Sequence, residues 1–140
     1  MFWDKTVTLY NKYEDEITGA IHWYRHKLTD CFYKVTNNTV TVGSVKLQTN
    51  DNIIRIPAQI KYLSADKWQE LPNDKKTEYL TLKGDDLIFL GDVSENIDEY
   101  TPGKRSSDII EKYKALGSVV VTSVNINDFL PEPHYLVRGE

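Results

Sequence analysis

Short runs in which apolar and polar residues alternate, separated by turn residues, recur along most of this sequence. Residues 5–13 read KTVTLYNKY, in which Val7 and Leu9 alternate with polar or amphipathic neighbours. A charged turn at residues 14–16 follows, and residues 19–28 (GAIHWYRHKL) alternate again. A period of two residues is typical of strands that bury one face. The two runs therefore predict a β-hairpin at the start of the chain.

Turn residues divide the remainder into further short segments. Asp30, Asn37–Asn38, Gly43–Ser44 and residues 50–52 are the turn signals in the first half. They predict strands at residues 31–35, 39–42, 45–49 and 53–56, and the later runs predict strands at 77–82, 86–90, 119–124 and 134–138.

Two segments have helical character. Residues 64–71 (SADKWQEL) begin with a capping serine and precede Pro72. A second helix is expected from Asp108, a capping residue, to Leu116, with Gly117 just after its end.

We expect a mainly β fold, a small β-barrel or sandwich with one or two short helices. The frequency of short strands and turns favours these two architectures. We found neither an internal repeat nor a linker, so residues 1–140 are expected to form a single domain.

Chemistry-bearing motifs are missing from the sequence. It contains neither HExxH, GxSxG, a P-loop nor GxGxxG. Cys31 is the only cysteine and is expected to be a buried apolar residue. His22, His26 and His134 lack a carboxylate at metal-ligand spacing and are expected on exposed strand faces. We therefore predict no catalytic, metal or cofactor site, and a protein that works by fitting against other proteins.

One stretch of charge is unusual. Between Gly84 and Gly103 there are six acidic residues and neither Lys nor Arg, and Lys104-Arg105 then follows. The acidic residues are Asp85, Asp86, Asp92, Glu95, Asp98 and Glu99. The stretch is interpreted as a solvated loop, as an interaction loop, or as an acidic surface that DNA slides past without binding. The net charge of −4 argues against tight phosphate binding.

Four segments resemble a known family. Residues 3–12 (WDKTVTLYNK), residues 18–28 (TGAIHWYRHKL), the CFY of residues 31–33 and residues 84–93 (GDDLIFLGDV) are similar to small virion proteins of tailed phages. These are head–tail connector proteins of the head-closure, or stopper, type, often described as minor capsid proteins.

The resemblance implies a homo-oligomeric ring, a hexamer or a dodecamer, at the virion neck. Its partners would be the portal or an adaptor protein above and tail proteins below, with packaged DNA passing through the lumen without specific binding. Assembly is expected in the host cytoplasm and without a membrane, since the N-terminal residues lack the apolar stretch of a signal peptide and the sequence lacks a membrane-spanning run.

The same resemblance suggests roles for particular residues. The six acidic residues named above are candidates to face the channel, and the candidates for subunit contact are Lys104, Arg105, Phe2, Trp3, Phe129 and Tyr135. Two alternatives remain open at this point. One is a tail-completion or terminator protein, and the other is a small ligand-binding β-barrel or accessory binding module, which would have a large apolar pocket.

Overall fold

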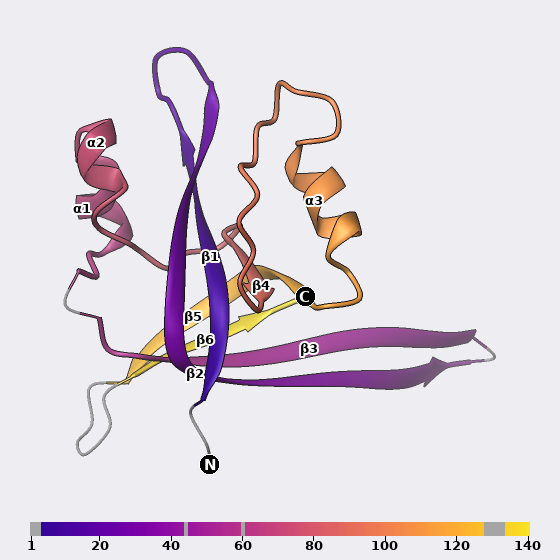
Figure 1. The fold of residues 1–140 in the computed structure, drawn as a ribbon. Coiled ribbons are helices and arrows are strands. Elements are labelled where there is room, and N and C mark those ends of the chain that lie inside the picture. Colours follow the sequence, from indigo (N-terminus) through magenta and orange to yellow (C-terminus); the bar gives the residue numbers. More distant parts are fainter. Residues whose placement is uncertain (1–3, 44, 60, 128–133) are drawn as a thin grey trace.

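The computed structural model describes residues 4–43, 45–59, 61–127 and 134–140, and gives only the backbone of residues 35–42, 45–51 and 127. Six strands of the described residues join in the order β1-β2-β3-β6-β5-β4 and close into a barrel (Figure 1). Every pair of neighbouring strands is antiparallel. The strands are β1 (Lys5–Glu14), β2 (Ile21–Val42), β3 (Val45–Pro57), β4 (Leu87–Leu90), β5 (Ser118–Asn127) and β6 (His134–Gly139).

The prediction of a mainly β fold is confirmed, and the barrel is the form that it takes. The described residues include three short helices, one more than the sequence predicts: α1 (Ala65–Gln69), α2 (Asn73–Lys76) and α3 (Ser106–Lys112). None of these helices is long and apolar enough to cross a membrane.

The predicted first hairpin joins β1 to β2. The Asp15 carboxylate accepts hydrogen bonds from the backbone amides of Ile17 at 2.8 Å and Thr18 at 3.1 Å. Gly19 then takes a left-handed conformation, with φ of 72°. These local bonds replace the strand ladder at the tip and turn the chain back on itself.

Strands β2 and β3 are much longer than the sequence predicts. Asp30 does not end a strand but forms a bulge within β2, with φ of 57°, where the register against β1 shifts. Residues of β2 up to Cys31 pair with β1, and from Phe32 onward β2 pairs with β3. A left-handed residue in a bulge bends a strand sharply, so Asp30 makes the corner at which β2 passes from one neighbour to the other.

The predictions of turns at Asn37–Asn38 and at residues 50–52 are also wrong, because both segments are parts of strands. Asn37 pairs with Asn50 and Asn38 with Thr49 in an uninterrupted ladder. The turn preference of asparagine is a weak local bias, and backbone pairing along a whole ribbon outweighs it.

Residues 77–82 are not a strand. Leu80 makes one isolated parallel bridge to Tyr62, and α2 occupies the segment just before residue 77. Leu80 and Leu82 are still buried in the barrel core, so the apolar pattern reports burial correctly although the backbone is irregular.

The capping position of helix α3 lies three residues earlier than predicted, at Arg105 and not at Asp108. Arg105 is the residue before its first turn, and Asp108 lies inside that turn. The Asp108 carboxylate accepts from the amides of Gly103 at 3.1 Å and Arg105 at 3.3 Å, so it caps the helix from within. Ile109 is buried, whereas Leu116 lies beyond the helix and is half exposed.

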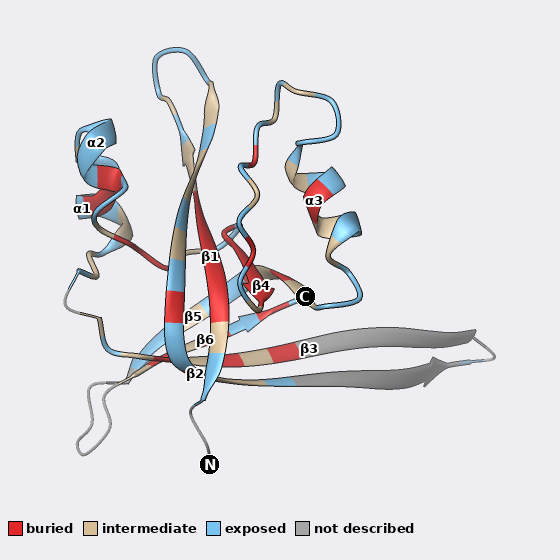
Figure 2. Ribbon diagram, in the orientation of Figure 1, coloured by how far each residue is buried: buried red, intermediate tan, exposed pale blue. Residues whose placement is uncertain are grey.

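The core has two parts, on opposite faces of β1. Figure 2 shows buried stretches in red on β1, β4 and α3. Val7 and Leu9 point into the barrel, which is filled by apolar side chains from the strands and from residues 80–82. Tyr10 faces outward and is covered by Val93, Ile97 and the α3 residue Ile109. The segment from β4 to α3 therefore packs as a layer outside the barrel.

Candidate functional site

The acidic stretch is bonded into the fold over most of its length. Asp86 is 0% exposed, so its place in the predicted channel-facing surface is wrong. Its carboxylate accepts from Asn11 Nδ2 at 2.9 Å, from the Lys12 amide at 2.9 Å and from the Lys83 amide at 3.1 Å, and it also pairs with Lys83 Nζ. Burial raises the pKa of Asp86, and the Lys83 ammonium group opposes that rise.

Asp92 connects the outer layer to β2, and Glu95 connects the loop of that layer to the end of α3. Asp92 forms ion pairs with Arg25 at 2.8 Å and with Lys27 at 3.4 Å, both on β2. The Glu95 carboxylate accepts from Lys112 Nζ at 2.6 Å and from the Tyr113 hydroxyl at 3.0 Å. The hydrogen bond from Lys112 is the largest cause that lowers the pKa of Glu95.

Asp98 and Glu99 stabilise the loop before α3. The Asp98 carboxylate accepts from the Tyr100 amide at 2.9 Å and the Thr101 hydroxyl at 2.7 Å. Glu99 accepts from the Trp23 indole at 3.0 Å and from the Ser106 amide at 2.9 Å. Both carboxylates therefore have a structural role in this loop, whether or not they also face a channel.

Asp85 differs from the other five acidic residues in its backbone, which is left-handed with φ of 72°. The residue is exposed. Asp85, Asp92 and Asp98 are the three candidates whose residues are exposed. A channel-facing role stays a prediction for them.

The candidates for subunit contact are scattered. Lys104 and Arg105 are exposed and lie side by side before α3. Tyr135 is 6% exposed and stacks on Tyr62 at 4.5 Å between ring centroids, so it belongs to the core and does not offer a contact surface. Phe2, Trp3 and Phe129 lie outside the described residues.

A buried lysine is the feature that the sequence did not predict. Lys76 is 1% exposed, and its ammonium group donates to the carbonyl oxygens of Gln69, at 3.1 Å, and Leu71. The same group lies 4.2 Å from the ring centroid of Tyr13 and 5.6 Å from that of Trp68. Burial lowers the pKa of Lys76. Carbonyl acceptors and aromatic faces stabilise a cation, so Lys76 ties α1 and α2 to β1.

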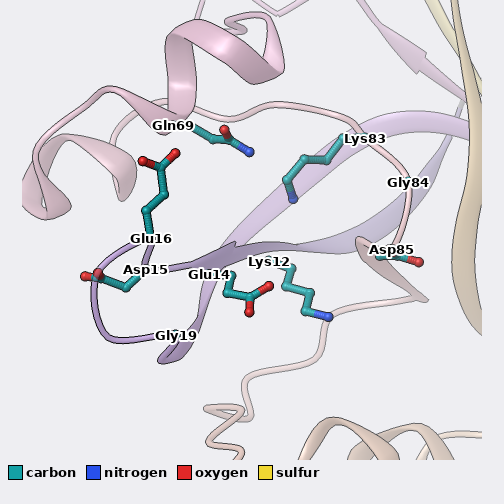
Figure 3. A pocket seen from close by; sticks show the side chains of 9 residues that line it. All are labelled: Lys12, Glu14, Asp15, Glu16, Gly19, Gln69, Lys83, Gly84 and Asp85. Carbon is teal, nitrogen blue, oxygen red and sulfur yellow. The ribbon is translucent and has the colours of Figure 1, made fainter.

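An open polar cleft of about 510 Å³ lies between the β1–β2 turn, α1 and the Lys83–Asp85 segment (Figure 3). Its lining residues are Lys12, Glu14, Asp15, Glu16, Gly19, Gln69, Lys83, Gly84 and Asp85. The mixture of both charge signs in an open, wet site favours neither a drug-like ligand nor a single ion. In the described part of the chain, no three His, Cys, Asp or Glu residues come together in a way that could hold a metal.

The cysteine and the three histidines belong to the side-chain types most often found in catalytic and metal sites. Cys31 is 0% exposed, as predicted, and burial raises the pKa of its thiol to about 12. His26 lies on a strand but is only partly exposed, contrary to the prediction, and burial and the nearby Arg25 lower its pKa to about 4. His22 is exposed, and His134 lies 3.3 Å from the Arg55 guanidinium, measured from Nε2 to a terminal nitrogen.

The most distinctive surface is a projecting arm, residues 36–51, formed by the far ends of β2 and β3. Beyond the Val35–Asn52 pair these two strands pair only with each other, from Thr36 opposite Asp51 to Val42 opposite Val45. Figure 1 shows the arm running outward past the other elements. Strand β6 covers β3 only from Asn52 onward, and β1 covers β2 only up to Cys31. Within the described ranges, therefore, neither outer edge of the arm has a third strand.

A filled, closed antiparallel barrel with one long projecting ribbon is thus the class of structure that this chain defines. The chain belongs to a family of unknown function (DUF6751), whose model matches residues 2–140. Comparison with curated proteins found no match, and comparison with solved structures found none either.

Proposed function

We propose that this protein is a structural subunit of a tailed-phage virion, a head–tail connector of the head-closure type, which works as a ring between portal and tail. The observation that carries the proposal is the arm of residues 36–51. A two-stranded ribbon without a third strand is marginally stable alone in water. It gains stability when another protein pairs with its edges.

The barrel interior argues in the same direction. Its core is filled by buried side chains such as Leu9, Ile54, Ile88 and Val137. A ligand-binding barrel needs an apolar cavity, and the clefts described on this protein are open. The geometry therefore favours a subunit that works through its outer surface over a carrier of small molecules.

The resemblance supplies the particular assembly. The segments that carry it include residues 5–12 of β1 and residues 87–90 of β4, which pair with each other in the barrel. The motifs that carry the resemblance therefore lie in the barrel body. They support a barrel like that of the connector proteins more directly than they support the same function.

The test is the mass and position of the assembly. Native mass spectrometry of the purified chain, alone and with its portal protein, should give a closed ring of identical subunits. Imaging of virions labelled on this protein should place it at the neck. A chain that stays monomeric in both samples, or density at another part of the virion, would contradict the proposal. Density attached to the tail tube and not to the portal would identify the terminator alternative.

A further inference from the structure

We infer that neighbouring copies join through their arms. The outer edge of residues 36–42 in one copy pairs with the outer edge of residues 45–51 in the next, so that the arms close into a shared antiparallel barrel. This inference rests on the ring of the proposed function and names the contact that builds it.

The direction of the strands permits this pairing without rearrangement. Within one arm, β2 runs toward the tip and β3 runs back, and the two are antiparallel. When identical arms stand side by side around a rotation axis, β3 of one copy lies next to β2 of the following copy, again antiparallel. Each copy then uses both of its open edges, and a closed ring leaves none.

The edges also lack the features that protect edge strands of monomeric proteins. Such edges are commonly blunted by proline, by bulges or by several lysines. Residues 36–51 contain no proline and only one lysine, Lys46. The β2–β3 pairing runs in one register from Phe32 opposite Arg55 to Val42 opposite Val45, whereas the β1–β2 and β5–β6 ladders each have a register shift. The arm is a long and regular template for another strand.

The charge of the arm favours a second copy as that strand. Its charged residues are Lys46 and Asp51, which are of opposite sign, in a chain with 27% charged residues. Identical segments brought together in a ring repel one another if each carries net charge. An arm with no net charge avoids this repulsion, although the whole chain is acidic.

The sequence pattern is compatible with the same assembly. Val40 is opposite Leu47 and Val42 is opposite Val45, while Thr39 is opposite Gln48 and Thr41 is opposite Lys46. Directly opposed positions share a face of a ribbon, and successive positions alternate. If neighbouring arms pair so that apolar positions are opposite apolar positions, all of these positions lie on one surface of the shared barrel.

Disulfide trapping between two single-cysteine variants tests the inference. One variant carries Thr39→Cys or Thr41→Cys on β2, and the other carries Lys46→Cys or Gln48→Cys on β3. The native Cys31 can remain, because it is buried and its pKa is raised to about 12. Rings assembled from a mixture of the two variants should give cross-linked dimers on oxidation, at least about tenfold more than rings of either variant alone.

Thr122→Cys, at an exposed position of β5, is the matched control off the arm and should give background cross-linking. Efficient cross-linking of Gln48→Cys or Thr39→Cys with itself would overturn the inference in favour of two-fold pairing. Rings seen by native mass spectrometry without arm cross-links would also overturn it, while leaving the proposed function in place. Absence of any ring would overturn both.

Discussion

At the scale of single residues, Asp86 joins stretches of chain that are far apart in sequence. Its carboxylate accepts from Asn11 and Lys12 on β1 and from Lys83 just before β4. Asn11 adds a second connection, since its side chain donates to the Thr81 carbonyl at 2.7 Å and accepts from the Thr81 amide at 3.2 Å. This buried polar cluster takes the place of a regular strand ladder beside β1 in residues 81–86.

Asp86→Asn is expected to lower the free energy of unfolding by about 2–3 kcal/mol, because a buried charge-assisted network loses its anion. Asp85→Asn is the matched control, since the neighbouring residue is exposed and asparagine tolerates its left-handed backbone; its change should stay within about 0.5 kcal/mol. Urea denaturation followed by tryptophan fluorescence measures both. Equal effects of the two variants would show that the buried cluster does not stabilise the fold.

His26 predicts a dependence of stability on pH. Its pKa is about 4 in the folded protein, against 6.5 for the free side chain, because burial and Arg25 disfavour the charged ring. Between about pH 4 and pH 6.5, this histidine therefore binds more protons in the unfolded chain than in the folded protein. This contribution is therefore fully present above pH 6.5 and is lost as the pH falls toward 4, to an extent of up to about 3 kcal/mol.

The measurement is the difference in unfolding free energy between the unmodified protein and His26→Gln from pH 7 to pH 4. The difference should change through this window in the direction that favours the variant at low pH. His22→Gln, at an exposed position of the same strand, is the matched control for the removal of a histidine side chain. A constant offset for His26→Gln at every pH would contradict the assignment.

At the scale of elements, the barrel depends on how closely its strands approach one another. Strand β6 lies between β3 and β5, and Gly139 pairs with Asn52 on one side and Val121 on the other. A methyl group at Gly139 would lie 2.3 Å from Val119 Cγ1 and 2.4 Å from the Val120 carbonyl oxygen. Glycine is therefore required by close packing at this position and not by an unusual backbone angle.

Gly139→Ala is expected to destabilise the protein by about 1–3 kcal/mol, because the β5 backbone must move to admit the methyl group. Gly84→Ala is the control, since the nearest atom to its added methyl group is 3.9 Å away. Thermal unfolding by circular dichroism should show a lower midpoint for the first variant and little change for the second. An unchanged midpoint for Gly139→Ala would mean that β5 and β6 separate more easily than their packing indicates.

At the scale of the whole molecule, the protein consists of a filled barrel and an arm that stands outside it. The buried residues of the two core clusters come from the barrel strands, from residues 80–82 and from the segment of residues 93–109. The barrel therefore has its own source of stability, in the apolar surface that it buries. Val35 and Asn52 are directly opposed, so a short turn that joins these two residues can close the hairpin in place of the arm.

Replacing residues 36–51 by Asn-Gly, a two-residue hairpin turn, is expected to leave the barrel folded and to abolish assembly. The unfolding midpoint should stay within a few degrees, and native mass spectrometry should show monomer only. Ile126→Thr removes an exposed apolar side chain, 52% exposed, from β5 and should still assemble. Rings formed by the arm-less variant would show that the barrel body, not the arm, makes the subunit contact.

Local patterns predicted those features that depend on neighbouring residues. The alternation in residues 5–13 and 19–28 predicted the first hairpin, and its turn is closed by the side chain of Asp15, inside the same segment. The apolar surroundings of Cys31 predicted its burial. By contrast, the outward residues of β1 looked like a solvent face, yet Thr8 and Tyr10 are buried, because residues 91–113 cover them.

The sequence by itself determined the β class of this protein, its first hairpin and its buried cysteine, because periodicity and turn chemistry act over a few residues. Only the tertiary structure decided that Asp86 is buried while Asp85 is exposed, because the partner Asn11 lies 75 residues away along the chain. It also decided that β2 and β3 continue through their asparagines into an arm, because cross-strand hydrogen bonds depend on register and not on the residue type at one position.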